Sequence, residues 1–372
     1  MPLTFDAVVI GAGIVGAACA HRLTRDGMSV AIVEDRTIGG GATAAGMGHI
    51  VVMDDSPAQL TLTRFSQQLW SDLRTQLPAS AEFQQIGTLW IAADDEEMAE
   101  VERKHEVYER NGMPAEVLAA GQLAKLEPNL RAGLAGALRV ACDSIVMAPV
   151  VAVFLVKACL KSGGRLFPHS AARAENGIVE LSDGTELRSD RIINASGASA
   201  GAITPNLPIR LRKGHLAITN RSPGFVQHEV IELGYLKSAH SLNTDSVAFN
   251  VQPRAGGEIL IGSSREFGST TAEVEQPMLS RMLARAFEFM PRLKDLPIER
   301  SWAGFRAATP DKLPLIGRWN DPSIYLAAGH EGLGITTSLA TAELLAAAIA
   351  GRSAPIDPEP YLPTRAIPGW PA

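Results

Sequence analysis

The first forty residues combine two short apolar runs with one helical pattern between them. Residues 5–10 (FDAVVI) and 29–33 (SVAIV) are mostly apolar, and apolar positions recur at helical spacing over residues 14–26. Apolar runs that do not alternate with polar residues are typical of parallel strands covered on both faces. The chain is therefore predicted to open with a strand, a helix and a second, parallel strand.

The middle of the chain changes to short segments of another kind. A strand at residues 88–92 and a charged helix at 94–110 depart from the opening pattern, and a helix rich in Ala and Val is predicted at 150–162. Two short strands, 177–181 and 186–187, flank an Asp-Gly turn, which indicates a hairpin. Further short strands are predicted at residues 216–219, 247–251 and 258–262. These last three strands predict an antiparallel sheet in a second domain.

The C-terminal part returns to apolar patterns. Residues 336–350 are nearly all Ala and Leu, which predicts a helix with one broad face in the core. The proline-rich tail at 355–371 is expected to lie extended on the surface. At 372 residues the chain is long enough for two domains.

A glycine motif stands between the first strand and the first helix. Gly11, Gly13 and Gly16 form G-x-G-x-x-G, the fingerprint in which the glycines allow a tight turn, close approach of a pyrophosphate, and close packing of helix on strand. Glu34 ends the second strand, where an acidic side chain accepts hydrogen bonds from a ribose and repels a 2′-phosphate. The motif predicts a dinucleotide site and argues against NADP, and it leaves NAD and FAD open.

Composition excludes several other classes. The net charge of −6 and the lack of a basic stripe argue against a nucleic-acid partner. The three cysteines, Cys19, Cys142 and Cys159, have no CxxC spacing, so we expect no zinc or iron–sulfur site, and buried small residues explain Cys19. Reduced thiols, an N-terminus without a basic leader and a longest apolar run (145–156) too short for a membrane span predict a cytoplasmic protein without a membrane span.

A second glycine-rich stretch, residues 39–48 (GGGATAAGMG), follows the fingerprint. Together the two resemble the FAD-dependent D-amino-acid oxidase and glycine oxidase family, in which such an "ATxxAAGM" segment follows the first β-α-β unit. Further segments are similar to those of the family: residues 192–198 (IINASGA), 302–317 (WAGFRAATPDKLPLIG, beside the family's WAGLRPGTPDGLPxIG) and 328–335 (AGHEGLGI), with residues 164–172 where its strand meets the adenine. The resemblance covers the chain from about residue 5 to about residue 350.

The resemblance implies an α/β fold with a Rossmann-type FAD-binding domain and a substrate domain built on an antiparallel sheet. It places the FAD-binding domain at residues 1–86, 142–214 and 303–372, and the substrate domain at 87–141 and 215–302. The residues implied to bind FAD are Gly11, Gly13, Ile14, Val15, Gly16, Glu34, Asp35, Arg36, Ala42, Thr43, Gly46, Met47, Ala172, Ala195, Gly197, Gly329, Gly332, Leu333, Gly334, Ile335 and Thr336. Because no cysteine lies near Gly304, where monomeric sarcosine oxidases carry the one bonded to flavin, FAD is expected to be non-covalent.

The same resemblance implies that Arg306 holds the carboxylate of a substrate, since a guanidinium fork pairs bidentately with a planar carboxylate. The structural alternative for this arginine is an interior ion pair. The implied reaction is hydride transfer from the carbon beside nitrogen to flavin N5, giving an imine that hydrolyses. No acid or base of the protein is required, and no catalytic residue is assigned.

Several positions depart from the plain glycine oxidase pattern. Asn250 stands where a substrate-contacting tyrosine is expected, and Gly332 stands where those enzymes have an arginine. His49 and His330 lie in segments expected near the flavin, where an imidazole could bind a second carboxylate or steady negative charge, and a histidine satisfied by the backbone is the alternative. Lys213 and His215 are placed either at a junction between the domains or in a solvated basic turn.

The turn sequence 329–338 and residues 48–55 are most similar to a branch with iminodiacetate oxidase and the large subunits of D-hydroxyproline, opine and cyanide-forming glycine dehydrogenases. Three functions remain open, two within this family and one outside it. The first is an oxidase of glycine, sarcosine, iminodiacetate or a D-amino acid that uses oxygen. The second is a flavin subunit, in a homo- or hetero-oligomer, that passes electrons to a partner protein. The third is a nicotinamide-linked dehydrogenase that only shares the fingerprint.

Overall fold

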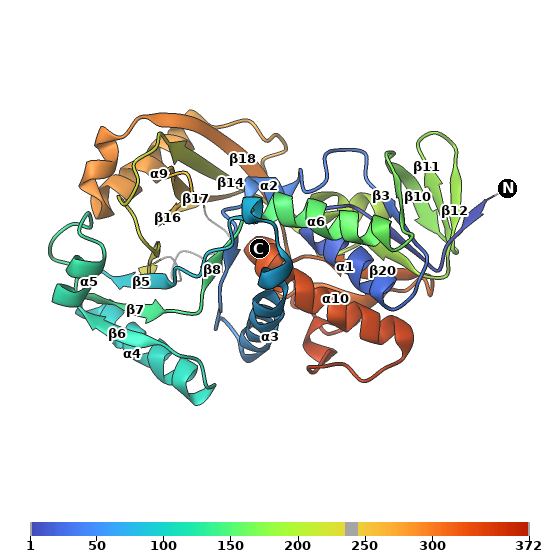
Figure 1. The fold of residues 1–372 in the computed structure, drawn as a ribbon, viewed down its shortest axis with the longest axis horizontal. Helices are drawn as coiled ribbons and strands as arrows, with labels where there is room; N and C mark the ends of the chain where they lie inside the picture. The colour runs from blue at the N-terminus through green and yellow to red at the C-terminus, as the bar shows by residue number, and fades with distance from the viewer. Residues whose placement is uncertain (1, 235–244, 371–372) are drawn as a thin grey trace. The chain divides into compact units, whose positions relative to one another are not determined.

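A computed structural model describes residues 2–234 and 245–370, which divide into two compact units (Figure 1). The first unit contains residues 1–81, 146–211 and 306–370, and the second contains 82–145 and 212–305. The predicted domains place their boundaries near the same points. The assignment of one domain to FAD and the other to substrate stays a prediction at this level.

A six-stranded, mostly parallel sheet forms the centre of the first unit. Its order is β19 (Leu315–Arg318), β20 (Ile324–Ala328), β13 (Ile192–Asn194), β2 (Ala7–Ile10), β3 (Val30–Val33) and β9 (Arg165–Phe167). Only the pair β19 and β20 is antiparallel among these neighbours. Both strands of the predicted opening unit are fully buried, as their apolar runs indicate.

Helices cover this sheet because their small apolar residues allow close approach. Helix α1 (Ile14–Arg25) packs against both α6 (Ala148–Lys161) and α10 (Gly334–Ala350), and α10 packs against α3 (Pro57–Leu73) (Figure 1). Among the described residues, only the helical stretch Glu331–Ala350 is long and apolar enough to cross a membrane. Core helices of soluble proteins are often equally long and apolar, and 56% of the most apolar part of this stretch is buried. We read it as the core helix that residues 336–350 predict.

A smaller sheet extends the first unit. Its order is β1 (Leu3–Thr4), β12 (Glu186–Arg188), β11 (Ile178–Leu181) and β10 (Ala171–Glu175). The strands β11 and β12 pair antiparallel, which confirms the predicted Asp-Gly hairpin. This hairpin belongs to the first unit, and its apolar residues share a core cluster with those of β2 and β3.

An eight-stranded sheet dominates the second unit. Its order is β18 (Ile298–Ala308), β14 (Arg210–Thr219), β17 (Ile259–Phe267), β16 (Ser246–Pro253), β15 (Glu229–Glu232), β5 (Thr88–Ala92), β7 (Gly136–Val140) and β6 (Glu116–Ala119). It is largely antiparallel, with β15 and β5 running parallel. The predicted antiparallel sheet is therefore confirmed.

One face of this sheet carries the core of the second unit. Helix α9 (Gln276–Phe289) places Met282 and Phe289 against Phe249 and Val251, and the rings of Phe249 and Phe289 stack with centroids 4.8 Å apart. The predicted charged helix is α4 (Asp95–Arg110), whose N-cap Asp94 accepts a hydrogen bond from Glu97. Helix α5 (Ala120–Leu126) completes the unit.

Candidate functional site

The turn between β2 and α1 is built so that two glycines cannot be replaced. Gly11 has φ +103°, and a Cβ there would lie 2.6 Å from the carbonyl oxygen of Ala195. A Cβ on Gly16 would lie 2.0 Å from the carbonyl oxygen of Gly11. Because no side chain fits at these distances, the absence of side chains is what lets helix, turn and neighbouring strand approach one another.

Gly13 differs from its neighbours because the space beside it is open. A Cβ there would meet only the Thr43 hydroxyl, at 3.3 Å. Gly13 is the N-cap of α1, provides no side-chain cap, and is followed by no acidic residue in the first turn. The positive end of the helix dipole is thus left to an anion such as a pyrophosphate.

Glu34 closes the turn from the other side. It follows β3, its Oε2 accepts a hydrogen bond from the Ala12 amide at 2.8 Å, and its Oε1 accepts one from the Arg36 amide at 3.0 Å. Each carboxylate oxygen keeps a further lone pair for a ribose hydroxyl. Asp35 and Arg36 are exposed and form only a loose ion pair at 3.9 Å.

The second glycine-rich stretch folds onto the first. The short helix α2 (Ala42–Ala45) holds Thr43, whose Oγ1 accepts a hydrogen bond from the Ile14 amide at 3.0 Å. Met47 is buried, and a Cβ on Gly46 would lie 3.2 Å from the Ile335 side chain. The stretch therefore packs between the fingerprint and the turn that precedes α10, as the resemblance implies.

Residues 329–333 form that turn, and together with the first three residues of α10 they are called the turn 329–336. Gly329 has φ +76°, and residues Glu331–Leu333 form one turn of 3-10 helix before α10 begins at Gly334. A Cβ on Gly334 would approach Val15 to 4.0 Å, so this turn lies beside the first turn of α1. The Thr336 hydroxyl donates to the His49 carbonyl at 3.0 Å and accepts from the Val51 amide at 3.2 Å.

Arg306 lies at the end of β18, half-buried, and within the first unit. Its Cδ and Nε are each 3.9 Å from the place that a Cβ on Gly332 would take. The arginine side chain therefore lies within contact distance of Gly332 in the turn 329–336. The structure thus brings the predicted substrate-binding arginine to the predicted flavin turn.

The two predicted histidines differ in their surroundings. His330 is buried, its Nε2 lies 2.9 Å from the Thr341 hydroxyl, and burial lowers its pKa to about 4. The lowered pKa keeps this imidazole neutral at neutral pH, so it offers hydrogen bonding rather than a positive charge. His49 is half-buried in β4 (His49–Ile50), where Thr336 fixes its backbone.

Asn250 lies in β16 of the second unit and is 5% exposed. Its neighbours Phe249 and Val251 point into the core under α9, so Asn250 points to the opposite face of the sheet. Its Oδ1 is buried without a hydrogen-bond partner in the described part of the chain. An unsatisfied buried amide oxygen is costly, which fits a ligand that donates a hydrogen bond there.

The structure corrects the prediction of a solvated basic turn at Lys213 and His215. Both side chains are fully buried in β14. The Lys213 Nζ donates to Glu275 at 2.7 Å and to Ser269 at 3.2 Å, and the His215 Nε2 accepts from the Glu275 amide at 3.1 Å. These two residues therefore anchor the start of α9.

Of the remaining cofactor positions, Ala195 adjoins the fingerprint and Ala172 lies apart from it. The Ala195 amide donates to the Ile10 carbonyl at 2.9 Å, and Gly197 has φ +58° at the start of a 3-10 turn. Ala172 is exposed in β10, at a register shift against β11. It thus lies in the smaller sheet and not in the nucleotide-binding sheet.

The residues present fit a bound dinucleotide. The first unit offers a helix N-terminus with no acidic residue in its first turn, a space beside Gly13 that only the Thr43 hydroxyl approaches, and an anchored carboxylate at Glu34 directly after β3 of the parallel sheet. Gly13, Glu34 and Thr43 would hold the pyrophosphate and ribose side of FAD, and the turn 329–336 would hold the flavin side. No group of three or more His, Cys, Asp or Glu residues that could hold a metal ion occurs in residues 2–234 and 245–370.

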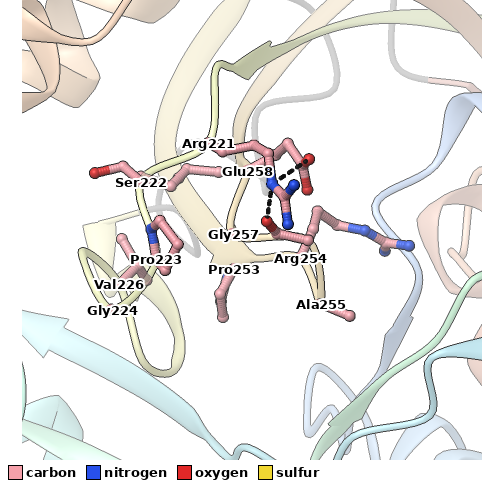
Figure 2. Close-up of a pocket in the computed structure, with 12 residues that line it drawn as sticks. Arg221, Ser222, Pro223, Gly224, Val226, Pro253, Arg254, Ala255, Gly257 and Glu258 are labelled. Atoms are coloured by element: carbon pink, nitrogen blue, oxygen red, sulfur yellow. Dashed lines mark hydrogen bonds and ion pairs between the residues drawn. The ribbon is translucent and has the colours of Figure 1, made fainter.

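A cavity of about 220 Å³ lies in the second unit between the turns at residues 221–226 and 253–259 (Figure 2). Its arginines are already paired: the Arg221 Nε lies 3.6 Å from Glu258, and the Arg254 Nη2 donates to Glu82 at 2.8 Å. None of the predicted site residues lines this cavity. We assign it no function.

Sequence reasoning missed a group of residues around the loop 309–314. Asp311 pairs with Arg365 of the C-terminal tail, and Lys312 pairs with Asp55. One signal was present in the sequence, because Lys312 occupies the position that is glycine in the family segment quoted above. The partners lie 54 and 257 residues away along the chain, and no local pattern could have found them.

Comparison with known proteins places this geometry in a family. Hydrogen cyanide synthase subunit HcnC of Pseudomonas aeruginosa is 28% identical over 98% of this chain and 97% of its own length. The glycine oxidase of Geobacillus kaustophilus is 26% identical over 98% of this chain and 97% of its own length. Its crystal structure superposes with a TM-score of 0.88, covering 98% of this chain and 100% of that one.

Other solved structures share the fold. L-proline dehydrogenase from P. horikoshii is 26% identical with a TM-score of 0.86, covering 98% of both chains. Iminodiacetate oxidase from Chelativorans sp. BNC1, at 24% identity and a TM-score of 0.83, covers 96% of this chain and 98% of its own and shows the same fold. The family model described as DAO, FAD dependent oxidoreductase, matches residues 6–348. The chain therefore belongs to the DAO family of FAD-dependent oxidoreductases, and FAD is its cofactor.

Proposed function

We propose that this enzyme oxidises the C–N bond of a small amino acid or N-substituted glycine. The observation that carries the proposal is Arg306, which lies along Gly332 in the turn implied to contact the flavin, in the same unit as the glycine fingerprint. Bound, non-covalent FAD supplies a hydride acceptor at flavin N5. The chain's own part is to bind and orient the substrate and to leave its amine neutral.

Arg306 would fix the substrate carboxylate through two parallel N–H···O bonds. Such a fork defines both position and orientation, and alignment of the reacting carbon is the main contribution that a protein makes to this kind of transfer. His49 is proposed as a further substrate contact, and His330 as a neutral hydrogen-bonding group. For Asn250, in the second unit, the substrate contact that the resemblance implies stays a prediction. The buried Oδ1 of Asn250 suits a donor such as an amine.

The overall reaction balances with oxygen as the electron acceptor. A substrate with a CH–NH₂ group, oxygen and water give a carbonyl compound, ammonia and hydrogen peroxide, and an N-substituted glycine releases a smaller amine instead of ammonia. Glycine, sarcosine, iminodiacetate, D-amino acids and D-hydroxyproline are the proposed substrate class. Similarity to glycine oxidases supports this class.

A second candidate is a flavin subunit that passes electrons to a partner protein instead of oxygen. The similarity to a hydrogen cyanide synthase subunit over nearly the whole chain favours it. In both candidates the substrate reduces the flavin in the same way. They differ only in the molecule that then accepts the electrons.

Anaerobic mixing of the purified flavoprotein with single compounds tests the proposal. The panel is glycine, sarcosine, iminodiacetate, D-proline, L-proline, D-hydroxyproline and D-alanine, and the flavin absorbance is followed before and after admission of air. Bleaching by one compound with rapid recolouring and peroxide supports the oxidase. Bleaching without recolouring supports the subunit, and no bleaching by any compound contradicts amino-acid oxidation.

A further inference from the structure

The C-terminal tail of the first unit is anchored and does not merely lie on the surface as expected. Tyr361 is 1% exposed and its hydroxyl donates to the Ala58 carbonyl at 2.6 Å. Arg365, four residues after Tyr361, makes more hydrogen bonds than Tyr361 does. The last residue of the predicted tail, Pro371, lies outside the described residues.

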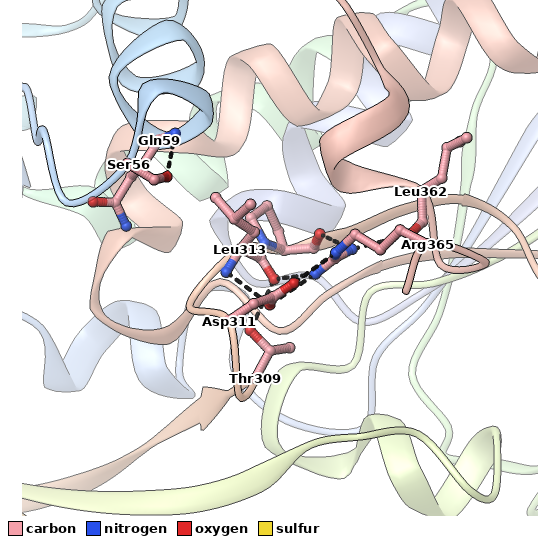
Figure 3. Close-up of polar contacts among 8 residues, drawn as sticks. Ser56, Gln59, Thr309, Asp311, Leu313, Leu362 and Arg365 are labelled. Carbon is pink, nitrogen blue, oxygen red and sulfur yellow. Dashed lines mark hydrogen bonds and ion pairs between the residues drawn. The ribbon is translucent and has the colours of Figure 1, made fainter. Parts of the chain in front are cut away.

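Arg365 uses every donor of its guanidinium group (Figure 3). Its Nε and Nη2 bind the two oxygens of Asp311 at 2.7 and 3.0 Å. Its Nη2 also donates to the Leu313 carbonyl at 2.9 Å, and its Nη1 donates to the carbonyls of Pro314 and Leu362 at 3.0 and 3.1 Å. Four of these five bonds from one nearly buried planar group go to the loop 309–314 and define its path.

This loop touches both parts of the proposed site. It begins three residues after Arg306, at the end of the same strand. The Thr309 hydroxyl donates to the Leu313 carbonyl at 2.8 Å, and its Cγ2 lies 2.7 Å from the place of a Cβ on Gly329. A shift of the loop would therefore move the end of β18 and the start of the turn 329–336 together.

A second fastening crosses from this loop to the segment after His49. Lys312 has φ +61°, a left-handed conformation that disfavours any residue except glycine. Its Nζ lies 3.5 Å from the Asp55 Oδ2, and both side chains are largely buried. Asp55 immediately precedes Ser56, the N-cap of α3. The strained lysine thus joins loop 309–314 to the segment that connects His49 with α3.

We propose that Lys312 and Arg365 are positioning residues that hold Arg306 in the orientation required for the substrate carboxylate. Neither is a catalytic residue. Together, Asp55, Asp311, Lys312 and Arg365 form a brace around the loop 309–314. The inference rests on the proposed role of Arg306.

The variant Lys312→Gly separates positioning from stability. Glycine relieves the left-handed strain and so offsets part of the loss of the Lys312–Asp55 pair, so the thermal midpoint should change little, and the flavin content should be unchanged. The second-order rate constant for flavin reduction by the substrate should nevertheless fall roughly tenfold, because misplacement of a binding group by a fraction of an ångström lowers the rate steeply. Asp55→Asn should give the same loss, and the double variant should lose no more than either single one.

Binding of acetate, followed through the flavin spectrum, gives a readout independent of catalysis. Its dissociation constant should rise in Lys312→Gly and in Arg365→Lys, and Lys312→Gly should have no further effect in an Arg306→Lys background. Arg365→Lys keeps the charge but loses the fork, so it repeats the test at the other end of the brace. Unchanged acetate binding and reduction in Lys312→Gly would overturn the proposal.

The two levels of inference fail differently. If Arg306→Ala reduces flavin as fast as the wild type, the proposed function fails. If Arg306→Ala abolishes reduction while Lys312→Gly and Asp55→Asn behave as the wild type, only the brace fails. A loss in Lys312→Gly that persists unchanged in the Arg306→Lys background also contradicts it, because the effect would then bypass Arg306.

Discussion

The two units are specified by opposite means. The first unit forms its cofactor cradle from missing side chains: Gly11 and Gly16 are required by contacts of 2.6 and 2.0 Å that exclude a Cβ. The second unit instead buries polar side chains against distant partners: the buried Lys213 binds the exposed Glu275, and the buried Glu127 binds His228. An empty cradle is specified by local glycine spacing, whereas a buried pair is specified by partners far apart along the chain.

Loss of the open space beside Gly13 should have the largest effect. We expect Gly13→Val to fold, after a small shift of the Thr43 hydroxyl that lies 3.3 Å from the new Cβ, but to purify without flavin, because a pyrophosphate needs that space. The measurement is the ratio of flavin to protein absorbance. Gly201→Val is the matched control, since nothing lies within 4 Å of its Cβ. If Gly13→Val purifies with one flavin per protein molecule, the space beside Gly13 is not needed for the pyrophosphate.

Breaking a buried pair in the second unit should destabilise without touching flavin. Glu232 is 3% exposed and accepts bonds from Arg285 Nε at 3.1 and 3.2 Å. Arg285→Met should cost about 3 kcal/mol of unfolding free energy, at the low end for a buried pair because Arg285 is itself partly exposed. Arg103→Met, which breaks an exposed pair with Glu100, should cost less than about 1 kcal/mol. Equal urea midpoints for the two variants would remove the contrast.

His330 makes the stability of the first unit depend on pH. Burial lowers its pKa from 6.5 to about 4, so below pH 6.5 the unfolded chain takes up a proton that the folded chain does not. Stability should therefore fall by about 2 kcal/mol between pH 7 and pH 5 through this residue alone. In His330→Asn that part of the pH dependence should disappear. If the unfolding free energy changes equally in the two proteins between pH 7 and pH 5, a neutral buried His330 is contradicted.

The smallest expected effect concerns Glu34. Glu34→Gln keeps the size of the side chain but weakens its hydrogen bonds to the Ala12 amide and to a ribose. The dissociation constant for FAD should rise roughly tenfold, which corresponds to about 1.4 kcal/mol. Titration of the apoprotein with FAD measures it, with Glu102→Gln, at an exposed position of α4, as the matched control. An unchanged constant would show that Glu34 does not contact the cofactor.

These contrasts explain how far the sequence could be read. The strands at 7–10, 30–33 and 88–92, and the helices α1, α4, α6 and α10, follow from local apolar periodicity and were predicted within a few residues. The Asp-Gly hairpin was predicted as well, and it lies in the first unit, where the predicted bounds 142–214 place it, although the smaller sheet that it joins was not predicted. Helix α5 and strand β6 have weak patterns and were missed.

The candidate site was predictable to the same extent. The role of a glycine depends on its local backbone conformation and on close approach by neighbours. Gly11, Gly13 and Gly16 could therefore be assigned roles from their spacing alone. Charged pairs could not: Glu275 lies 62 residues from Lys213, and Arg365 lies 54 residues from Asp311. The buried state of Lys213 and His215 depends on such distant partners, which is why a solvated turn was considered for them.

Substrate-driven flavin reduction in Arg306 variants tests the central claim most directly. Purified Arg306→Ala and Arg306→Lys proteins with full flavin content are mixed anaerobically with the compound that bleaches the wild type. If Arg306 binds the substrate carboxylate, both variants should bleach at least a hundredfold more slowly at equal substrate concentration, on the order expected for the loss of a bidentate, aligning contact. Bleaching at the wild-type rate in either variant would contradict the account.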